Sequence, residues 1–492
     1  MNLRGELILV LDAGTTSTRA MVFDLDGGLR GSAQRELAQH YPQAGWVEHD
    51  AEEIWQSTLA CARAAVSDAG GADRIACLGI TNQRETVIAW DNASGEPLHR
   101  ALVWQDRRTA DACASLRAAG HEAAVQAATG LLLDPYFSAT KMRWLLDTVP
   151  AVRAAAQSRR LALGTVESWL VYKLTGGLRI TDAANASRTS LLPLAAAGFD
   201  QGLCDLFGVP RPALSEVVDN AGNFGAALPE WFGAPIPITG LAGDQQAATI
   251  GQGCLLPGET KATFGTGAFV LANMGAAIPQ SRHRLLGTVL VQLHGKRQFA
   301  LEGSVFTAGS LIQWLRDALG LIASAGESEA LARSVADSGG VVIVPALAGL
   351  GAPHWKPEAR ASITGLSFAS TRAHIVRAAL EAMALQTHDL AQAFAGDGAP
   401  WSGLRIDGGM SANDWIAQDL ADMLALEVER PDFVETTALG AAMLAGLGAG
   451  LFASLAEAAA AMRGPVRRFA PGLGAAQRLA RLEAWHRALA GL

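Results

Sequence analysis

An acidic residue followed by a turn rich in glycine and hydroxyl groups interrupts the first apolar segment of the chain. Residues 8–24 read ILVLDAGTTSTRAMVFD, so Asp12 ends one apolar run before the next begins. Such a turn presents backbone N–H groups and hydroxyls that suit phosphate oxygens, and its glycine lets a ligand approach the backbone. The side chains that offer hydroxyls or positive charge are Thr15, Thr16, Ser17 and Arg19. Asp12 suits Mg²⁺ held through water, because this ion gives up its water reluctantly.

A similar stretch, TKATFGTGAFVLAN, occupies residues 260–273 and places Thr266 in the turn. A third glycine turn follows in LRIDGGMSAND, ahead of a helix that we expect to be capped near Ser411 or Asn413. One turn alone is equally typical of an ordinary hairpin. Two of them, one in each half, together with the third glycine turn, favour a nucleotide site. The chain contains neither GxGxxG nor GxxxxGK[ST], so the phosphates must be bound in another way.

Charged and aromatic residues elsewhere could bind a small polar substrate. Arg84 and Glu85 are adjacent in TNQRET, and a donor fork beside an acceptor suits the hydroxyls of a polyol, although a surface ion pair is the alternative. Trp104 and Tyr136 follow apolar runs, where aromatic residues usually belong to the core. Asp244, in LAGDQQAA, could be a general base or simply a helix N-cap.

Composition excludes several classes of function. The chain has 492 residues, is 50% hydrophobic and carries a net charge of −8 without a basic block, which argues against nucleic acid as a partner. No apolar run is long enough to cross a membrane, and the first ten residues do not resemble a signal peptide, so we expect no membrane insertion. The five scattered cysteines fit the reducing cytoplasm and argue against a cysteine-based metal site.

Alternating strand and helix patterns predict an α/β fold in two halves. The strands are expected at 7–12, 20–24, 75–80, 86–90, 101–104 and 341–347, and the helices at 108–118, 137–146, 305–319 and 372–395. A stretch with glycine and proline near 252–258 predicts the boundary between a domain of residues 1–252 and another of residues 253–492.

The two hairpin motifs and LRIDGGMSAND resemble the two phosphate motifs and the adenosine motif of the actin-like ATPase superfamily. Within it, the chain resembles the FGGY carbohydrate kinases, and among them the glycerol kinases, nearly from end to end. The segments that carry this resemblance are YPQAGWVEHDAEEIW, GITNQRET, VWQDRRTA, TGLLLDPYFSATKMRWLLD, TDAANASRTSL, GLAGDQQAA, SLIQWLRD, VPALAGLGAPHW and ETTALGAAMLAG.

The resemblance implies two ribonuclease-H-like domains, each with a five-stranded mixed sheet, and an interdomain nucleotide cleft. The first phosphate motif and the glycerol site would belong to the N-terminal domain, and the second phosphate motif and the adenosine motif to the C-terminal domain. It also implies that glycerol and ATP react to give sn-glycerol 3-phosphate, with Mg²⁺ as cofactor and Asp244 as base. The implied substrate residues are Arg84, Glu85, Trp104, Tyr136, Asp244, Gln245 and Phe269. The implied nucleotide residues are Thr15, Thr16, Ser17, Arg19, Thr266, Gly309, Gln313, Gly409 and Asn413. Asp12 and Asp244 would serve the metal, and a homo-oligomer, dimer or tetramer, is expected.

Three residues depart from the family pattern: Ala13 replaces a usual glutamine, and His354 and Lys356 replace a usual tyrosine and aspartate. The basic glycine loop that binds fructose bisphosphate in some bacterial relatives has no counterpart here, so we expect no strong inhibition by that sugar. Three alternatives stay open: a kinase for another polyol or ketose such as dihydroxyacetone, an actin- or chaperone-like ATPase, and a glycerol sensor without chemistry.

Overall fold

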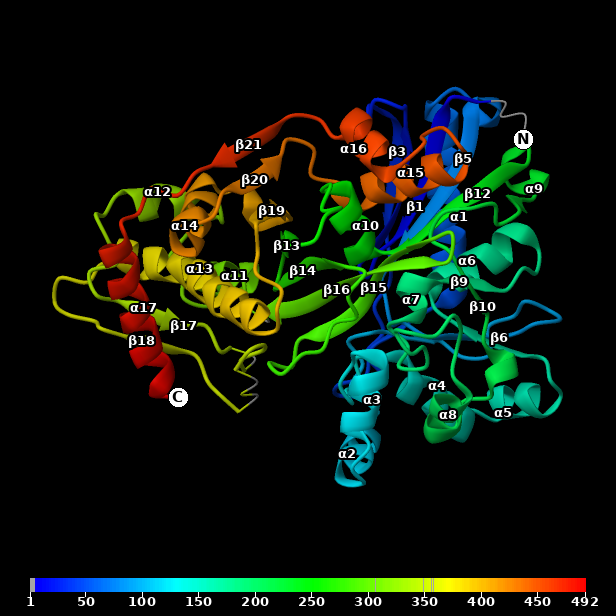
Figure 1. The fold of residues 1–492 in the computed structure, drawn as a ribbon, viewed down its shortest axis with the longest axis horizontal. Coiled ribbons are helices and arrows are strands. Elements are labelled where there is room, and N and C mark those ends of the chain that lie inside the picture. The colour runs from blue at the N-terminus through cyan, green and yellow to red at the C-terminus, as the bar shows by residue number, and fades with distance from the viewer. Residues whose placement is uncertain (1–4, 306, 348, 355, 357) are drawn as a thin grey trace.

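The computed structural model describes residues 5–305, 307–347, 349–354, 356 and 358–492, and it contains two units, each built around a mixed β-sheet (Figure 1). Phe306, Ala348 and Trp355, which belong to segments discussed above, lie outside the described residues. Among the described residues, six strands form the first sheet in the order β11-β12-β5-β1-β2-β3. Their bounds are β1 (Leu7–Ala13), β2 (Ser17–Phe23), β3 (Leu29–Glu36), β5 (Ile75–Asn82), β11 (Ala226–Ala227) and β12 (Ile236–Gly243).

The second sheet contains seven described strands in the order β15-β16-β14-β13-β19-β20-β21. Their bounds are β13 (Glu259–Phe264), β14 (Ala268–Gly275), β15 (Leu286–Leu293), β16 (Lys296–Val305), β19 (Gly403–Asp407), β20 (Val428–Pro431) and β21 (Val466–Phe469). All strands of the first sheet precede residue 252, and all strands of the second follow residue 258.

The two sheets share a five-strand core. In each, the first three strands are antiparallel neighbours, and the fourth and fifth run parallel to the first. The expectation of five strands per sheet was wrong, because β11 extends the first sheet at one edge and β15 and β21 extend the second at both edges. The repeated core explains why the two glycine turns look alike: each joins the first two strands of its sheet.

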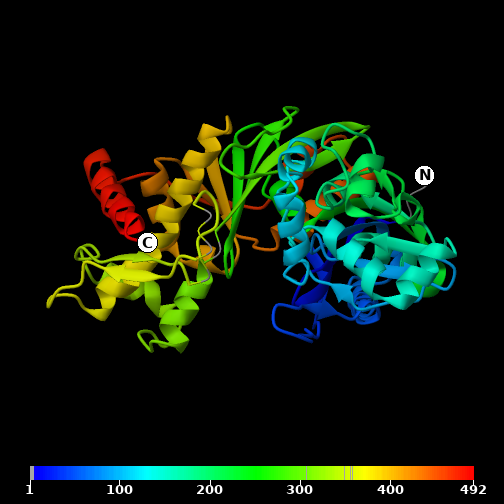
Figure 2. The same cartoon turned by 90° about the horizontal axis from the view of Figure 1, so that it is seen from below.

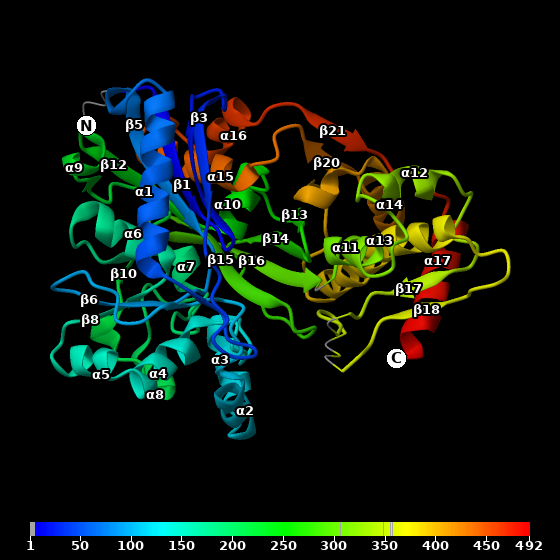
Figure 3. The same ribbon diagram turned by 180° about the vertical axis from the view of Figure 1, so that it is seen from behind.

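Helices cover both faces of the first sheet. Helix α1 (Ala51–Asp68) lies on the face that Figure 3 shows, and its buried apolar side chains pack against β1, β2 and β3. Helices α10 (Asp244–Gly251) and α15 (Thr436–Gly448) pack together on the opposite face. A methyl group on Gly440 would lie 1.8 Å from the carbonyl oxygen of Ala247, so glycine permits this close approach. Helix α15 follows the second sheet in sequence yet packs on the first.

A helical region attached to the first unit accounts for the cyan and teal part of Figure 2. Its helices are α2 (Ala110–Ala118), α3 (Glu122–Thr129), α4 (Ser138–Thr148), α5 (Pro150–Gln157), α6 (Val166–Thr175), α7 (Ala183–Ala186) and α8 (Gln201–Phe207), whereas the short α9 (Pro229–Phe232) lies against α1. The short strand pairs here are β4 (Glu48–His49) with β7 (Ala101–Leu102), β6 (Ile88–Asp91) with β8 (Leu161–Gly164), and β9 (Ile180–Asp182) with β10 (Glu216–Val218).

The second unit surrounds α13 (Arg372–Gly396), whose length matches the predicted helix closely. The helices α11 (Gly309–Asp317), α12 (Glu327–Arg333), α14 (Asp414–Leu424) and α17 (Ala475–Ala490) belong to this unit, and β17 (Val342–Val344) pairs with β18 (Ser362–Thr364). Helix α16 (Leu455–Met462) packs instead with α10 and α15 on the first unit. The predicted helix at 305–319 begins only at Gly309, and the predicted strand at 341–347 spans three residues.

Candidate active site

The first glycine turn joins β1 to β2 and leaves its backbone donors free. The carbonyl oxygens of residues 14–16 accept hydrogen bonds of 2.8–3.0 Å from Gln83, Gln39 and the backbone of Leu37. The N–H groups of these three residues have no partner within the described part of the chain. The turn is thus held from behind while its donors remain available, which is what a phosphate group requires.

The other predicted residues of this motif lie beside the turn. Thr16 is exposed, and Thr15 and Ser17 are partly exposed. Arg19 points toward α15, where it forms an ion pair with Glu435.

The second turn, between β13 and β14, contacts the start of α11. The carbonyl of Thr266 accepts hydrogen bonds from the backbone of Ala308 (3.0 Å) and from both the backbone and the hydroxyl of Ser310. A methyl group on Gly309 would lie 2.5 Å from the carbonyl oxygen of Gly265, so only glycine fits there.

The third glycine turn lies next to the second. Gly408 has φ 86°, and a methyl group on it would lie 2.6 Å from the carbonyl of Phe264. The neighbouring Gly409 has open space beside it. Asn413 caps α14, as predicted, by accepting hydrogen bonds from the backbone of Trp415 and Ile416. Gln313 is exposed on α11. The structure therefore brings three of the nucleotide-side segments together.

Asp244 is the first residue of α10, at the end of β12. Its Oδ1 accepts a hydrogen bond of 2.7 Å from the Gln245 backbone and lies 3.2 Å from Arg84 Nε. The side chain keeps 31% of its surface exposed, so a ligand can reach it. Burial raises the pKa of Asp244, and the Arg84 charge offsets part of that rise. Gln245 accepts a hydrogen bond of 2.5 Å from the buried Lys261 of β13, which the sequence reasoning missed.

Arg84 and Glu85 are buried, at 2% and 1% exposed, so the alternative of a surface ion pair was wrong. Arg84 binds Glu302 of β16 through both terminal nitrogens, at 2.6 and 3.0 Å. Glu85 adopts a left-handed backbone with φ 60°, which is uncommon for a side chain of this size, and accepts a hydrogen bond of 2.6 Å from Arg188.

Three predicted aromatic residues form one group next to Arg84. The ring of Trp104 lies edge-on to Tyr136 at 5.6 Å and to Phe269 at 6.3 Å between ring centres. Trp104 Nε1 donates to Thr15 Oγ1 over 2.9 Å, and Tyr136 accepts from Arg84 over 3.4 Å. Because Phe269 follows the second turn, this group connects both glycine turns with the charged side chains.

The two carboxylates proposed for the metal influence each other. Burial raises the pKa of Asp12 to about 7; Arg19 opposes this rise, and the charges of Asp244 and Glu435 add to it. The described residues contain no group of three or more His, Cys, Asp and Glu side chains placed to hold a metal. Two carboxylates nevertheless fit Mg²⁺, which commonly takes one or two of them together with phosphate oxygens and water.

Both units of the chain match domains of one known family. Residues 7–251 match the N-terminal domain of the FGGY family of carbohydrate kinases, and residues 260–449 match its C-terminal domain. The chain belongs to the FGGY family of carbohydrate kinases. Glycerol kinase from Rhodospirillum rubrum is 53% identical over 98% of both chains, and glycerol kinase from Gluconobacter oxydans is 53% identical over 98% of this chain and 95% of its own.

Solved structures of FGGY kinases superpose on the whole molecule. Plasmodium falciparum glycerol kinase with ADP is 35% identical and has a TM-score of 0.94 over 98% of this chain and 97% of its own. Xylulose kinase from Rhodospirillum rubrum is 26% identical, with a TM-score of 0.87 over 99% of both chains. The expected α/β fold of two actin-like ATPase domains is confirmed by these matches.

Sequence reasoning missed Arg188, Lys261 and Glu302 of this FGGY kinase site. Each is a charged residue within a buried segment, and Glu302 interrupts the buried apolar run of β16 directly after Leu301. That interruption was a usable signal, because buried charges require partners. The departures from the family pattern lie in different places. Ala13 is buried in β1, while His354 and Lys356 contact Asp389 and the C-terminal Leu492, beside α17.

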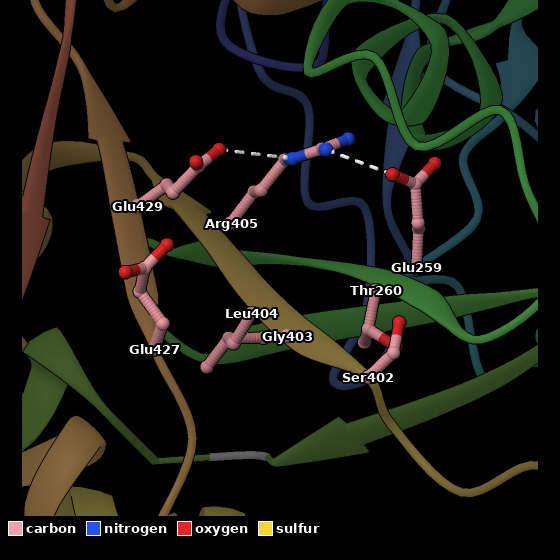
Figure 4. A pocket seen from close by; sticks show the side chains of 8 residues that line it. All are labelled: Glu259, Thr260, Ser402, Gly403, Leu404, Arg405, Glu427 and Glu429. Atoms are coloured by element: carbon pink, nitrogen blue, oxygen red, sulfur yellow. Dashed lines mark hydrogen bonds and ion pairs between the residues drawn. The ribbon is translucent and has the colours of Figure 1, made fainter. Parts of the chain in front are cut away.

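Two further features lie outside this site. A cavity of about 160 Å³ opens at the starting ends of β13 and β19, where Arg405 is paired with Glu259 and Glu429 (Figure 4). Those strands carry the glycine turns at their other ends. Of the helices that the structure describes, none has the length and apolar character needed to cross a membrane.

Proposed function

We infer that this FGGY kinase transfers the terminal phosphoryl group of ATP to glycerol and forms sn-glycerol 3-phosphate. One observation carries the inference: Asp244, a partly exposed carboxylate, lies 3.2 Å from the buried Arg84, and Arg84 in turn contacts Tyr136 in a wall of three aromatic rings. A three-carbon polyol needs donors and acceptors for its hydroxyls and an apolar surface for its carbons. The glycerol kinases named above, similar over nearly the whole chain, support the same substrate.

The residues divide the chemistry between them. Asp244 accepts the proton of the attacking hydroxyl, while Arg84 and Glu85 orient the glycerol hydroxyls against Trp104 and Tyr136. Phosphoryl transfer depends mainly on alignment and charge neutralisation, and the free N–H groups of the first turn supply both for the phosphates. Closure of the two units over the site would exclude water, which would otherwise compete with glycerol as acceptor.

The nucleotide side is proposed from the same geometry. The hydroxyls and charge of the first turn, together with Thr266, are placed for the phosphates, and the third glycine turn is placed for the adenosine. Asp12 and Asp244 would hold Mg²⁺, which neutralises phosphate charge when bound. The nucleotide-side residues are Thr15, Thr16, Ser17, Arg19, Thr266, Gly309, Gln313, Gly409 and Asn413.

The test measures ATP consumption with and without glycerol and identifies the product by mass spectrometry and stereospecific oxidation. We expect turnover to require glycerol, and Asp244→Asn to lower kcat at least ~100-fold, as loss of a general base does. Arg84→Ala should mainly raise the KM for glycerol, since its hydrogen bonds already exist in the ground state. An ATP hydrolysis rate that does not depend on glycerol would contradict the proposal. Faster turnover of dihydroxyacetone or a pentulose than of glycerol in a substrate panel would assign the kinase to that substrate instead.

Location and assembly are separate proposals. All five cysteines are free and buried, which supports a reducing compartment such as the cytoplasm. A homo-oligomer, dimer or tetramer, stays a prediction that sedimentation velocity can test.

A further inference from the structure

The carboxylate that holds Arg84 comes from the other sheet. Arg84 lies just after β5 of the first sheet, whereas Glu302 lies on β16 of the second, 218 positions away in sequence. Glu302 Oε2 accepts from Arg84 Nη1 over 2.6 Å, and Oε1 accepts from Arg84 Nη2 over 3.0 Å. This two-point geometry fixes the plane of a guanidinium group as well as its charge.

The pair belongs to a closed cluster of four buried charges. Arg188 donates to Glu302 over 3.2 Å and to Glu85 over 2.6 Å, so two arginines alternate with two glutamates. None of the four side chains is more than 2% exposed. Burial alone would raise the pKa of Glu302, but Arg188 and Arg84 lower it to about 2, so this residue stays ionised at neutral pH.

The position of Glu302 relative to the first unit is itself fixed. The strand paired with β16, β15, lies against α7 of the first unit in the centre of Figure 1. Thr288 of β15 forms hydrogen bonds with Ser187 (2.9 Å) and Gln246 (3.0 Å). The carboxylate is therefore presented to Arg84 by a strand that both units hold in place.

Binding by Glu302 uses only part of the Arg84 donor set. Of the five N–H bonds of a guanidinium, Glu302 takes two and Asp244 faces the one on Nε. The other two point toward Tyr136 and Gln246, each at 3.4 Å, which is the long limit of a hydrogen bond. These weakly used donors are the ones that a substrate hydroxyl can take over.

We propose that Glu302 is a positioning residue for substrate binding: from the second sheet it fixes the orientation in which Arg84 offers its remaining donors to a glycerol hydroxyl. The inference rests on the proposed role of Arg84 in glycerol binding. It explains why a buried carboxylate on a strand of the second sheet faces a residue of the first unit. It also predicts that loss of the Glu302 charge affects the substrate alcohol and not the nucleotide.

The experiment compares Glu302→Gln, Arg84→Ala and the double variant by steady-state kinetics in which glycerol and ATP are varied separately. We expect Glu302→Gln to raise the glycerol KM at least ~10-fold and to change the ATP KM less than ~2-fold. In the Arg84→Ala background, Glu302→Gln should change the glycerol KM less than ~2-fold, because Glu302 acts through Arg84. A purely structural residue would reduce the amount of active enzyme, which lowers the apparent kcat but does not change KM.

Glu429→Gln is the matched control, since it removes a glutamate from an ion pair with Arg405 in the same sheet but away from the site. Its glycerol KM should equal that of the wild type. If Glu302→Gln does not fold, the charge-balanced variant Glu302→Gln/Arg188→Gln replaces it in the same comparison. An unchanged glycerol KM in the folded Glu302 variant, or a full additional increase in the Arg84→Ala background, overturns the positioning role. An unchanged KM in Arg84→Ala alone would instead overturn the proposed role of Arg84.

Discussion

The stability of the first glycine turn should depend on pH through one buried histidine. His49 is 1% exposed, and its Nδ1 lies 3.2 Å from Gln83 Nε2, a group that can only donate. Nδ1 must therefore be the acceptor, and Nε2 must carry the proton that Gln39 Oε1 accepts over 2.8 Å. Gln39 and Gln83 donate in turn to the carbonyls of Thr15 and Gly14. This chain of hydrogen bonds to the turn therefore requires the neutral, Nε2-protonated form of His49.

The loss of folding stability on protonation of His49 follows from the shift of its pKa. Burial, with a smaller contribution from His40, lowers the pKa of His49 from 6.5 to about 4. Because the unfolded chain binds this proton more readily than the folded one, the stability is complete above pH 6.5 and falls as the pH decreases toward 4. The loss from this residue reaches about 2 kcal/mol at pH 5 and about 3 kcal/mol below pH 4.

Denaturant unfolding of the wild type and His49→Gln at several values between pH 5 and 7.5 measures this loss. At pH 7.5 the variant should be less stable by about 1 kcal/mol, the contribution of a typical hydrogen bond. At pH 5 the order should reverse, since the variant has no group to protonate. His121→Gln, which changes a partly exposed histidine ahead of α3, should keep the pH dependence of the wild type. Parallel curves for the wild type and His49→Gln would refute the argument.

Three other substitutions test separate features. Gly440→Ala should lower the free energy of unfolding by about 1–3 kcal/mol or more, because its methyl group meets a backbone carbonyl of α10, whereas Gly198→Ala, with open space around it, should change melting little. Trp104→Ala should raise the KM for both glycerol and ATP, because this side chain contacts the aromatic wall and the hydroxyl of a nucleotide-turn threonine, and kinetics with each substrate varied separately would show it. Asp389→Asn should loosen α17 and increase limited proteolysis near the C-terminus without changing the glycerol KM, because Asp389 accepts hydrogen bonds from Trp485 on α17 and from other side chains.

The local structure that the sequence predicted correctly depends on local chain geometry. A strand, a glycine turn and a second strand are encoded within one short stretch, residues 7–23, and the cap at Asn413 needs only its own side chain and the next three residues. The partner of Arg84 was unpredictable in this way. Nothing near TNQRET indicates a carboxylate 218 positions away, so the two charges looked like an exposed pair. The return of α15 to the first sheet was missed for the same reason, because it depends on tertiary packing of small residues.

The order of the strands explains why residues so far apart in sequence form one site. β1, β5 and β12 are parallel neighbours, and their carboxyl ends are in register, with Ala13 beside Asn82 and Asn82 beside Gly243. Asp12, Arg84 and Asp244 follow or end these strands, so they meet at one edge of the sheet, where neighbouring strands are about 4.8 Å apart.

The second sheet repeats this arrangement, because β13 and β19 are also parallel neighbours that end at its two glycine turns. In both sheets, therefore, the proposed site residues lie at or next to the carboxyl ends of neighbouring parallel strands. Glu302 departs from this rule: it lies within β16, which is joined to its neighbours by antiparallel pairing, and it reaches Arg84 because β16 extends toward the first unit. Its placement is therefore not explained by the rule that site residues follow the ends of parallel strands, which is why a selective change in the glycerol KM of Glu302→Gln would point to a function for that contact.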